Sequence, residues 1–482
     1  MLNSNNLKFA EFISTSESNT IPEQILKFIY IGDAMEKFLL SLLAAVLVVS
    51  VFVVALFLRK KNERLRLIGI IKERWGKNPL RYSKSTINEN THCYYSNMKD
   101  NNITTNTSNT TNTNNTTNAN NNTNNNCNND NCGVSLHIDD ITWNDLDMDN
   151  VFNRINNTGS TVGEQYLYYL LRNPVFDGSV LKERERLTAF FQSNRKQRMD
   201  LQFLLAKLGK TKSIDITNYF LNEQKYASYE SLKYKLLSIG FLLSPLLMIF
   251  NLSFGIFVAI AFLTTNITVY YKKKYEIEAH LEAFNYIVSL VDCADKISNL
   301  NIKEISTYQN SLKACLKKLK GVISKSFLVL YRTEDPFLEY VKVILLGEII
   351  AYESMFKLIL KYKQDLMDIF NTVGLIDSLI SVASYRVSID YYSRPELYSI
   401  KNVLNNSNNN EHNSSDSSGS GSLSKSVDFK DICHPLINNP VPNSLCIDKP
   451  ILITGSNASG KSTFLKTIAI NAIFAQTIYT CL

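Results

Sequence analysis

The chain has 482 residues, enough for about three domains, which excludes a lone peptide module or a minimal binding domain. Hydrophobic residues make up 45% of it, and its eight cysteines show neither a CxxC pair nor metal-ligand spacing, which argues against a disulfide scaffold or structural zinc and favours reduced thiols in the cytosol. The formal net charge of +7 is concentrated in one stretch, so the overall charge does not indicate DNA binding.

The first predicted element is a transmembrane helix at residues 38–58. This run contains no charged residue, and it is long enough to cross a hydrocarbon core of about 30 Å. Residues 1–37 carry five Asp or Glu against three Lys, whereas Arg59, Lys60 and Lys61 directly follow the run. The positive-inside rule therefore places residues 1–37 outside and the chain after Leu58 in the cytoplasm. A buried core helix is the alternative.

A basic juxtamembrane segment, residues 59–100, follows this helix. Between Arg59 and Lys84 it contains ten Lys or Arg and only two Glu. We interpret this stretch as a stop-transfer flank that contacts anionic lipid headgroups. Contact with DNA is the alternative interpretation.

A second uncharged run, residues 236–271, predicts a transmembrane hairpin. As one straight helix it would be about 54 Å long, far more than a bilayer requires, so we expect two short spans that turn near Asn251, Leu252 and Ser253. Lysines flank the run on both sides, which keeps both of its ends in the cytoplasm. A buried helical pair inside a soluble domain is the alternative.

Two low-complexity segments interrupt the chain. Residues 101–131 are almost wholly Asn and Thr, and residues 405–422 are mostly Asn, Ser and Gly. Neither has apolar surface to offset its ordering entropy, so we expect both to be disordered inserts. The Asn-x-Thr sequons of the first insert lie on the cytoplasmic side in this topology, so we interpret them as a consequence of composition.

Between these inserts the chain is predicted to be mainly helical. Four segments carry apolar residues at three and four spacing, as in the long amphipathic helices of a bundle: Arg184–Leu208, Tyr275–Leu300, Ile302–Ile323 and Phe337–Phe370. One predicted buried face consists of Ala283, Ile287, Leu290, Val291 and Ala294. We expect these stripes to serve helix packing only.

A phosphate-binding motif lies near the end of the sequence. Pro450–Thr454 is a short apolar run that predicts a buried parallel strand, and Thr463–Thr477 predicts a helix. Between them, Gly455 to Ser462 fits G-x-x-x-x-G-K-[ST] at every fixed position. Glycines let such a loop aim backbone N–H groups at phosphate oxygens, and the N-terminus of the next helix attracts the same anion.

The motif predicts the ligands ATP and Mg²⁺. Lys461 can reach the β- and γ-phosphates, and the Ser462 hydroxyl can ligate the metal ion. The candidate nucleotide-contacting residues are Gly455, Ser456, Asn457, Ala458, Ser459, Gly460, Lys461, Ser462, Thr463 and His434. No residue is assigned a catalytic role.

Several stretches resemble the DNA mismatch-repair MutS family. His434-Pro435-Leu436, Val441-Pro442-Asn443, and the loop from Ile453 to Thr463 are similar to the start of the MutS ATPase domain. Trp143 to Pro174 is similar to the opening of the MutS helical core, and Gly374 to Glu396 resembles the connection from core to ATPase domain. The resemblance covers about residues 137–482. It implies that Asn457 joins the nucleotide contacts, that His434 lies near the purine, and that two ATPase domains form a homodimer.

The chain also departs from the family pattern in three places. Nothing before Trp143 is similar to the mismatch-reading domain, and Pro440 replaces an aromatic residue often seen before the Val-Pro-Asn position, which puts base stacking in doubt. Only 21 residues follow Lys461, too few for the Asp-Glu strand end, signature loop and His of MutS-like ATPases. We therefore expect a truncated ATPase domain that does not hydrolyse ATP and whose motif strand lacks its parallel neighbours.

The sequence thus predicts a mainly α-helical core with transmembrane helices, followed by an incomplete P-loop α/β ATPase domain. The core is assigned to residues 137–384 and the ATPase part to residues 385–482, both in the cytoplasm. Three functions remain open: a DNA-handling ATPase at the membrane, an ATP-driven transport or membrane-remodelling protein, and a non-catalytic membrane interaction protein. The predicted partners are ATP, a second copy of the chain and the membrane; DNA is retained as a partner that the charge distribution does not support.

Overall fold

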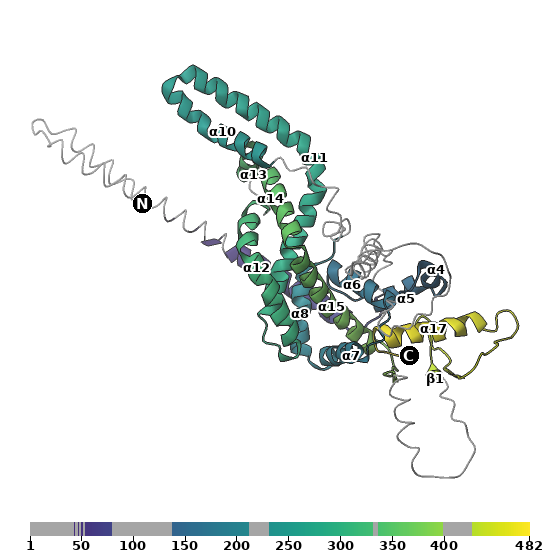
Figure 1. Ribbon diagram of the computed structural model, residues 1–482. Coiled ribbons are helices and arrows are strands. Elements are labelled where there is room, and N and C mark those ends of the chain that lie inside the picture. Colours follow the sequence, from purple (N-terminus) through teal and green to yellow (C-terminus); the bar gives the residue numbers. More distant parts are fainter. Residues whose placement is uncertain are drawn as a thin grey trace, which may run out of the picture. The chain divides into compact units, whose positions relative to one another are not determined.

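The computed structural model describes residues 54–79, 137–211, 231–330, 336–398 and 427–482, together with Leu43, Leu47, Ser50 and Val51 (Figure 1). Residues 1–37 and the two predicted inserts, 101–131 and 405–422, lie outside the described residues. The chain divides into two units, Met1–Gly69 and Ile70–Leu482. In the first unit, the described residues of the predicted transmembrane helix 38–58 are helical and exposed.

The second unit is mainly helical, as the sequence predicts. Its helices are α4 (Asp140–Asp145), α5 (Met148–Ile155), α6 (Thr161–Arg172), α7 (Gly178–Ser193), α8 (Arg195–Leu208), α10 (Ser231–Phe250), α11 (Leu252–Ser298), α12 (Ser306–Leu330), α13 (Pro336–Ile344), α14 (Gly347–Lys361), α15 (Lys363–Val387) and α17 (Lys461–Thr477). Its strands are β1 (Val427–Ile432) and β2 (Asn443–Ile447).

Two long predicted helices are broken in the structure. Arg184–Leu208 is divided at Asn194, whose φ of −99° and ψ of 76° leave the helical region, so that α7 ends and α8 begins there. Phe337–Phe370 is divided into α13, α14 and the start of α15, with Leu346 at a left-handed φ of 52° between the first two. Apolar spacing continues across these breaks, and for that reason the pattern does not reveal them.

Helix α15 forms the centre of the helical core. Its side chains from Val373 onward are almost all buried, and it packs mainly against α6, α7 and α12. Gly374 allows the close approach of α6, because a Cβ there would meet Tyr166 Cβ at 2.7 Å. The predicted face of α11 also belongs to this core: Ala283, Ile287, Leu290, Val291 and Ala294 are all at most 5% exposed. This part of the prediction is confirmed.

Three described helices are long and apolar enough to cross a membrane: Leu232–Phe250, Leu252–Tyr275 and Lys363–Val387. The third is α15, and 78% of its most apolar window is buried inside the protein, so its apolar composition is explained by the core. The first two correspond to the predicted hairpin 236–271 and turn at Asn251, as expected. Only 17% and 11% of their most apolar windows are buried inside the protein.

Residues 71–79, in the middle of the predicted basic juxtamembrane segment 59–100, pack on the helical core, which the sequence did not indicate. The N–H of Gly76 donates to Ser384 Oγ of α15 at 3.0 Å, and the Asn157 side chain donates to the carbonyl of Arg74 at 3.1 Å. The Arg198 guanidinium of α8 lies 3.6 Å from the centre of the Trp75 ring. Residues 71–79 are therefore held by contacts with the helical core.

The predicted strand Pro450–Thr454 is wrong. The described residues contain one sheet, in which β1 and β2 pair antiparallel with an irregularity between Phe429 and Ile432. Ile451 and Leu452 are 43% and 87% exposed, and neither belongs to a strand. A strand is stabilised by hydrogen bonds to neighbouring strands, and neither β1 nor β2 pairs with this run. The predicted α/β arrangement is therefore not seen in the described part of the chain.

Candidate nucleotide-binding site

The predicted phosphate-binding loop leads directly into α17. Gly460 is the residue before the helix, with a left-handed φ of 87°, and its carbonyl accepts the first helical hydrogen bond from Phe464 N at 2.9 Å. Ala458 is also left-handed, with φ 64°. Ser459 N donates to Ser456 O at 3.3 Å and closes the turn. Alternation of left-handed and ordinary backbone conformations is the geometry that gathers N–H groups around an anion.

The Lys461 side chain folds back over this loop. Its Nζ atom donates to the carbonyl oxygens of Gly455 at 2.6 Å and Ser456 at 2.5 Å. A Cβ at Gly455 would lie 2.9 Å from Ser459 Oγ, so glycine permits the tight closure of the loop. The positive charge of Lys461 thus lies beside the N-terminus of α17, which itself favours anions.

The remaining predicted loop residues are open to solvent. Gly455 through Gly460 are exposed, and so are the side chains of Ser462 and Thr463 in the first turn of α17. The first N–H groups of a helix have no partner within it, so this turn offers donors to a ligand. The structure therefore brings the predicted loop, Lys461 and Ser462 together at one helix end.

His434 lies on the flank of α17. Its Nδ1 atom accepts a 3.3 Å hydrogen bond from Leu436 N. Burial, together with the nearby positive charge of Lys466, lowers the pKa of His434. The neighbouring Cys433 is tied to the same helix, because Asn471 donates to its carbonyl at 3.1 Å. His434 thus lies beside α17 and is not a member of the loop itself.

Helix α17 is fastened to the helical core. Ile470 and Phe474 are fully buried in the main hydrophobic cluster, where the Phe474 ring meets Tyr385 of α15 edge to face at 6.3 Å between ring centres. Arg386 of α15 donates to Thr480 Oγ1 at 2.9 Å and to the carbonyl of Tyr479 at 2.9 Å, just beyond α17. The helix that begins at the candidate site therefore packs directly on α15 of the core.

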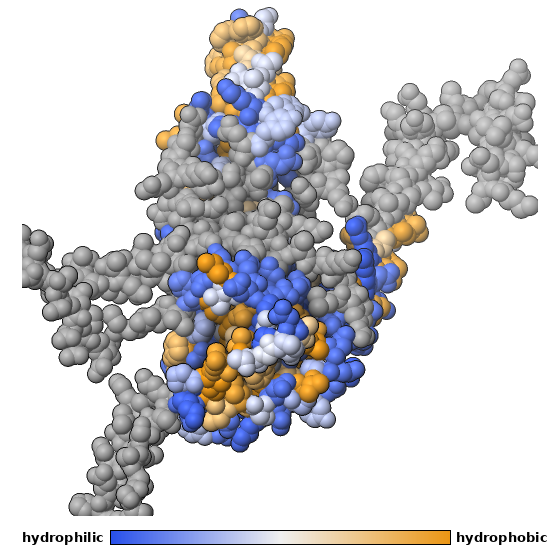
Figure 2. Space-filling model, turned by 90° about the vertical axis from the view of Figure 1, so that its right-hand side faces the viewer, coloured by the Kyte–Doolittle hydropathy of each residue, from blue (hydrophilic) through white to orange (hydrophobic). Residues whose placement is uncertain are grey.

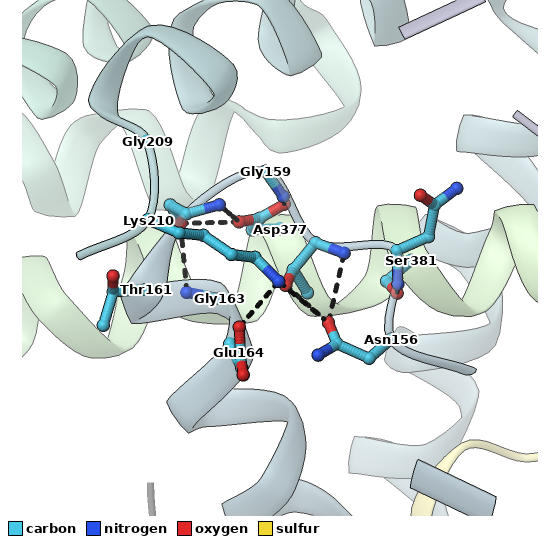
Figure 3. Close-up of polar contacts among 12 residues, drawn as sticks. Asn156, Gly159, Thr161, Gly163, Glu164, Gly209, Lys210, Asp377 and Ser381 are labelled. Carbon is cyan, nitrogen blue, oxygen red and sulfur yellow. Dashed lines mark hydrogen bonds and ion pairs between the residues drawn. The ribbon is translucent and has the colours of Figure 1, made fainter. Parts of the chain in front are cut away.

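A buried polar cluster lies where the start of α6 meets α15 (Figure 3). Asp377 accepts hydrogen bonds from the N–H groups of Gly159 at 3.0 Å and Ser160 at 2.9 Å, and from the Ser160 hydroxyl at 2.6 Å. The Ser160 side chain in turn caps α6 by accepting from Gly163 N. We call Gly159, Ser160, Gly163 and Asp377 the α6–α15 clasp.

One charged pair lies at the edge of this clasp. Burial raises the pKa of Asp377, an effect that its hydrogen bonds from Gly159 and Ser160 oppose. Lys210 forms a 2.6 Å ion pair with Glu164 beside it. The sequence indicates the stretches around Gly163 and Asp377 separately, but neither spacing nor charge indicates that residues so far apart meet.

Comparison with known proteins gives a partial match. Over 128 residues the chain is 33% identical to the DNA mismatch repair protein MutS of Carboxydothermus hydrogenoformans, and the matched stretch covers 24% of this chain and 12% of that protein. No family model matches the chain. The chain thus spans only a small part of the length of this relative, and the match supports a distant MutS-like relationship at most.

Proposed function

We propose that the chain is a membrane-anchored, MutS-like protein that binds ATP with Mg²⁺ at the Gly455–Ser462 loop. The observation that carries this proposal is the Lys461 ammonium folded over a glycine-bounded loop at the N-terminus of α17. The loop amides would hold the phosphates, with Asn457 and Thr463 beside them and His434 on the flank. Ser462 would supply a ligand to Mg²⁺.

The proposal is restricted to binding. Phosphoryl transfer also requires a carboxylate to hold Mg²⁺ and a group to orient the attacking water, and no residue of the chain is assigned to either role. Nucleotide binding would be coupled to the helical core through α17. Phe474 of α17 packs on Tyr385 of α15, and Arg386 of α15 holds the residues that follow α17. Association of two nucleotide-bound copies through this region is part of the proposal.

The decisive experiment is titration of the full chain in detergent with ATP and Mg²⁺. Lys461→Ala is expected to weaken ATP binding at least tenfold, which corresponds to about 1.4 kcal/mol. Lys449→Ala is the matched control, because it removes the same charge from an exposed position shortly before the loop. Equal affinities of the two variants, or no ATP uptake by the parent protein, would contradict the proposal.

The match to a DNA mismatch repair protein makes DNA the first macromolecular partner to test. Proteins that neutralise DNA phosphates lose affinity steeply with salt. DNA binding by the full chain that weakens strongly between low and physiological salt would support a DNA-handling role. Binding that is absent at low salt would exclude it.

A second candidate function is ATP-dependent remodelling of, or transport across, a membrane. The exposed apolar surfaces of α10 and the first part of α11 favour it, because a soluble helical domain would bury such surfaces. Replacement of residues 236–271 by a soluble linker would abolish a membrane activity while leaving DNA affinity intact. The opposite pattern would exclude this candidate.

A further inference from the structure

The hairpin formed by residues 236–271 exposes apolar side chains on most of its outer surface. Leu236, Leu243, Phe250 and Phe257 are 67%, 53%, 88% and 71% exposed, and the run contains no charged residue. Figure 2 shows hydrophobic atoms gathered at the top of the view, where Figure 1 places the turn between α10 and α11. Such a surface requires an apolar environment.

Three threonine hydroxyls of the hairpin and one N–H group at its turn are satisfied within it. The hydroxyls of Thr264, Thr265 and Thr268 donate to carbonyls three or four residues earlier in α11, at 2.7 to 3.0 Å. At the turn, Asn251 accepts from Phe254 N at 3.1 Å. Because hydrocarbon offers no hydrogen-bond partner, internal satisfaction of this kind is what a lipid environment demands.

The two arms also pack as membrane helices do. A Cβ on Gly240 would lie 2.6 Å from the Phe262 ring, and a Cβ on Gly255 would lie 2.6 Å from Met248. Glycines therefore bring the arms into close contact, which is the usual basis of helix association in lipid. These features together favour a lipid bilayer as the environment of the exposed apolar surface.

The base of the hairpin is clamped by α13 and α14. The Asn266 side chain donates to the carbonyl of Ile344 at 2.9 Å, and the Tyr270 hydroxyl donates to Glu348 at 2.7 Å. Tyr234 and Tyr270 share a small hydrophobic cluster with Leu346. Glu348 at this level, and the lysines that flank the run, belong in water or among headgroups.

The part of the hairpin beyond this clamp is short. Leu236–Phe250 contains 15 residues and Leu252–Thr265 contains 14, so each arm extends about 20 Å at 1.5 Å per residue. The hydrocarbon core is about 30 Å thick. To emerge on the far side, the hairpin would have to pull the Glu348 carboxylate and the flanking lysines into lipid.

We propose that residues 236–271 form a re-entrant hairpin, which enters the bilayer from the side of its basic base and ends inside the hydrocarbon. This inference refines the predicted transmembrane hairpin, and it rests on the membrane part of the proposed function but not on nucleotide binding. The lysines at both ends, Lys233, Lys235 and Lys272–Lys274, would lie among anionic headgroups. The tip at Phe250 would lie in the acyl chains beyond the bilayer midplane.

Depth-dependent quenching tests this arrangement. Phe250→Trp and Leu236→Trp, each in the full chain, are placed in vesicles of zwitterionic and anionic lipids whose acyl chains carry bromine at known depths. Phe250→Trp is expected to be quenched most by the deepest bromines and Leu236→Trp by the shallowest. The parent chain, with its two tryptophans, gives the background. Strongest quenching of Phe250→Trp by shallow bromines, or no quenching, would overturn the proposal.

Chemical access to the tip gives an independent readout. Ser253→Cys in sealed vesicles is expected to react with a membrane-impermeant maleimide from neither side, above the background of the native cysteines, and to react after detergent is added. Reaction with reagent trapped on the far side would overturn the proposal. Titration of the same vesicles with ATP and Mg²⁺ separates the two proposals, because nucleotide binding does not depend on where the tip lies.

Discussion

The carboxylate of Asp377 accepts a 2.9 Å hydrogen bond from the backbone N–H of Ser160, a residue 217 positions earlier in the chain. Gly163, one turn further along α6, has no room for a side chain, because a Cβ there would overlap the Asp377 carboxylate. The α6–α15 clasp therefore fixes the start of α6 against the middle of the central helix. It joins two helices of the core that lie far apart in the sequence.

Removal of the Asp377 carboxylate is expected to destabilise the helical core. Asp377→Ala leaves the N–H groups of Gly159 and Ser160 without their acceptor. Each unsatisfied buried group costs about 1–3 kcal/mol, so we expect the free energy of unfolding to fall by about 3 kcal/mol. Urea unfolding of the detergent-solubilised chain measures it. Asp368→Asn, on a half-buried position of the same helix, is the control. Equal effects of the two substitutions would contradict the role assigned to the clasp.

The same carboxylate predicts a pH dependence of stability. Burial raises the pKa of Asp377 above its ordinary value of 3.8. The folded state therefore binds the proton more tightly than the unfolded state, and stability is lost as pH rises from 3.8 through the folded pKa. Asp377→Asn removes this contribution. The parent chain is expected to lose stability relative to Asp377→Asn as pH rises across this window, and a difference that is constant with pH would contradict the shift.

Local features of the fold follow from the sequence, whereas contacts between distant segments do not. Helical periodicity located the buried face of α11, and the turn at Asn251 followed from the length of an uncharged run. The G-x-x-x-x-G-K-[ST] spacing located the loop and the start of α17. The meeting of Gly163 with Asp377 depends on tertiary packing, which spacing in one sequence does not encode. The strand at Pro450–Thr454 was wrong because strand propensity requires a neighbouring strand to be realised.

Arg386 is expected to hold the segment after α17 against the core. Its guanidinium is buried, forms a 2.6 Å ion pair with Glu185 of α7 and donates to the carbonyls of Ile478 and Tyr479. Arg386→Met keeps roughly the length of the side chain but removes this ion pair and the hydrogen bonds to the segment after α17. Because Glu185 keeps Arg394 as a partner, the main loss is the attachment of that segment.

The measurement for Arg386 is limited proteolysis of the full chain, followed by mass analysis of the fragments. Arg386→Met is expected to expose cleavage sites in α17 at a protease concentration that leaves the parent intact. Arg394→Met is the control, because its side chain is 58% exposed and pairs with the same Glu185 from the surface. If Arg394→Met released α17 as readily as Arg386→Met, the anchoring role of Arg386 would be wrong.

Trp75 is expected to fix residues 71–79 of the basic segment to the core. Its ring lies under the buried Arg198 guanidinium, which also donates to the carbonyl of Phe191 at 2.6 Å. A cation–π contact of a partly desolvated pair contributes about 1–2 kcal/mol, and loss of ring packing adds to it. Trp75→Ala should therefore lower the free energy of unfolding by about 2 kcal/mol.

Urea unfolding also tests Trp75, with Lys72→Ala as the control, because Lys72 is an exposed residue of the same segment. Trp75→Phe is expected to lie between the two, since a phenyl ring keeps part of the contact with Arg198. The chain has two tryptophans, and Trp143 is fully buried, so emission from the Trp75→Phe variant reports on the core alone. Equal stability of Trp75→Ala and Lys72→Ala would contradict the stabilising role assigned to the Trp75 ring.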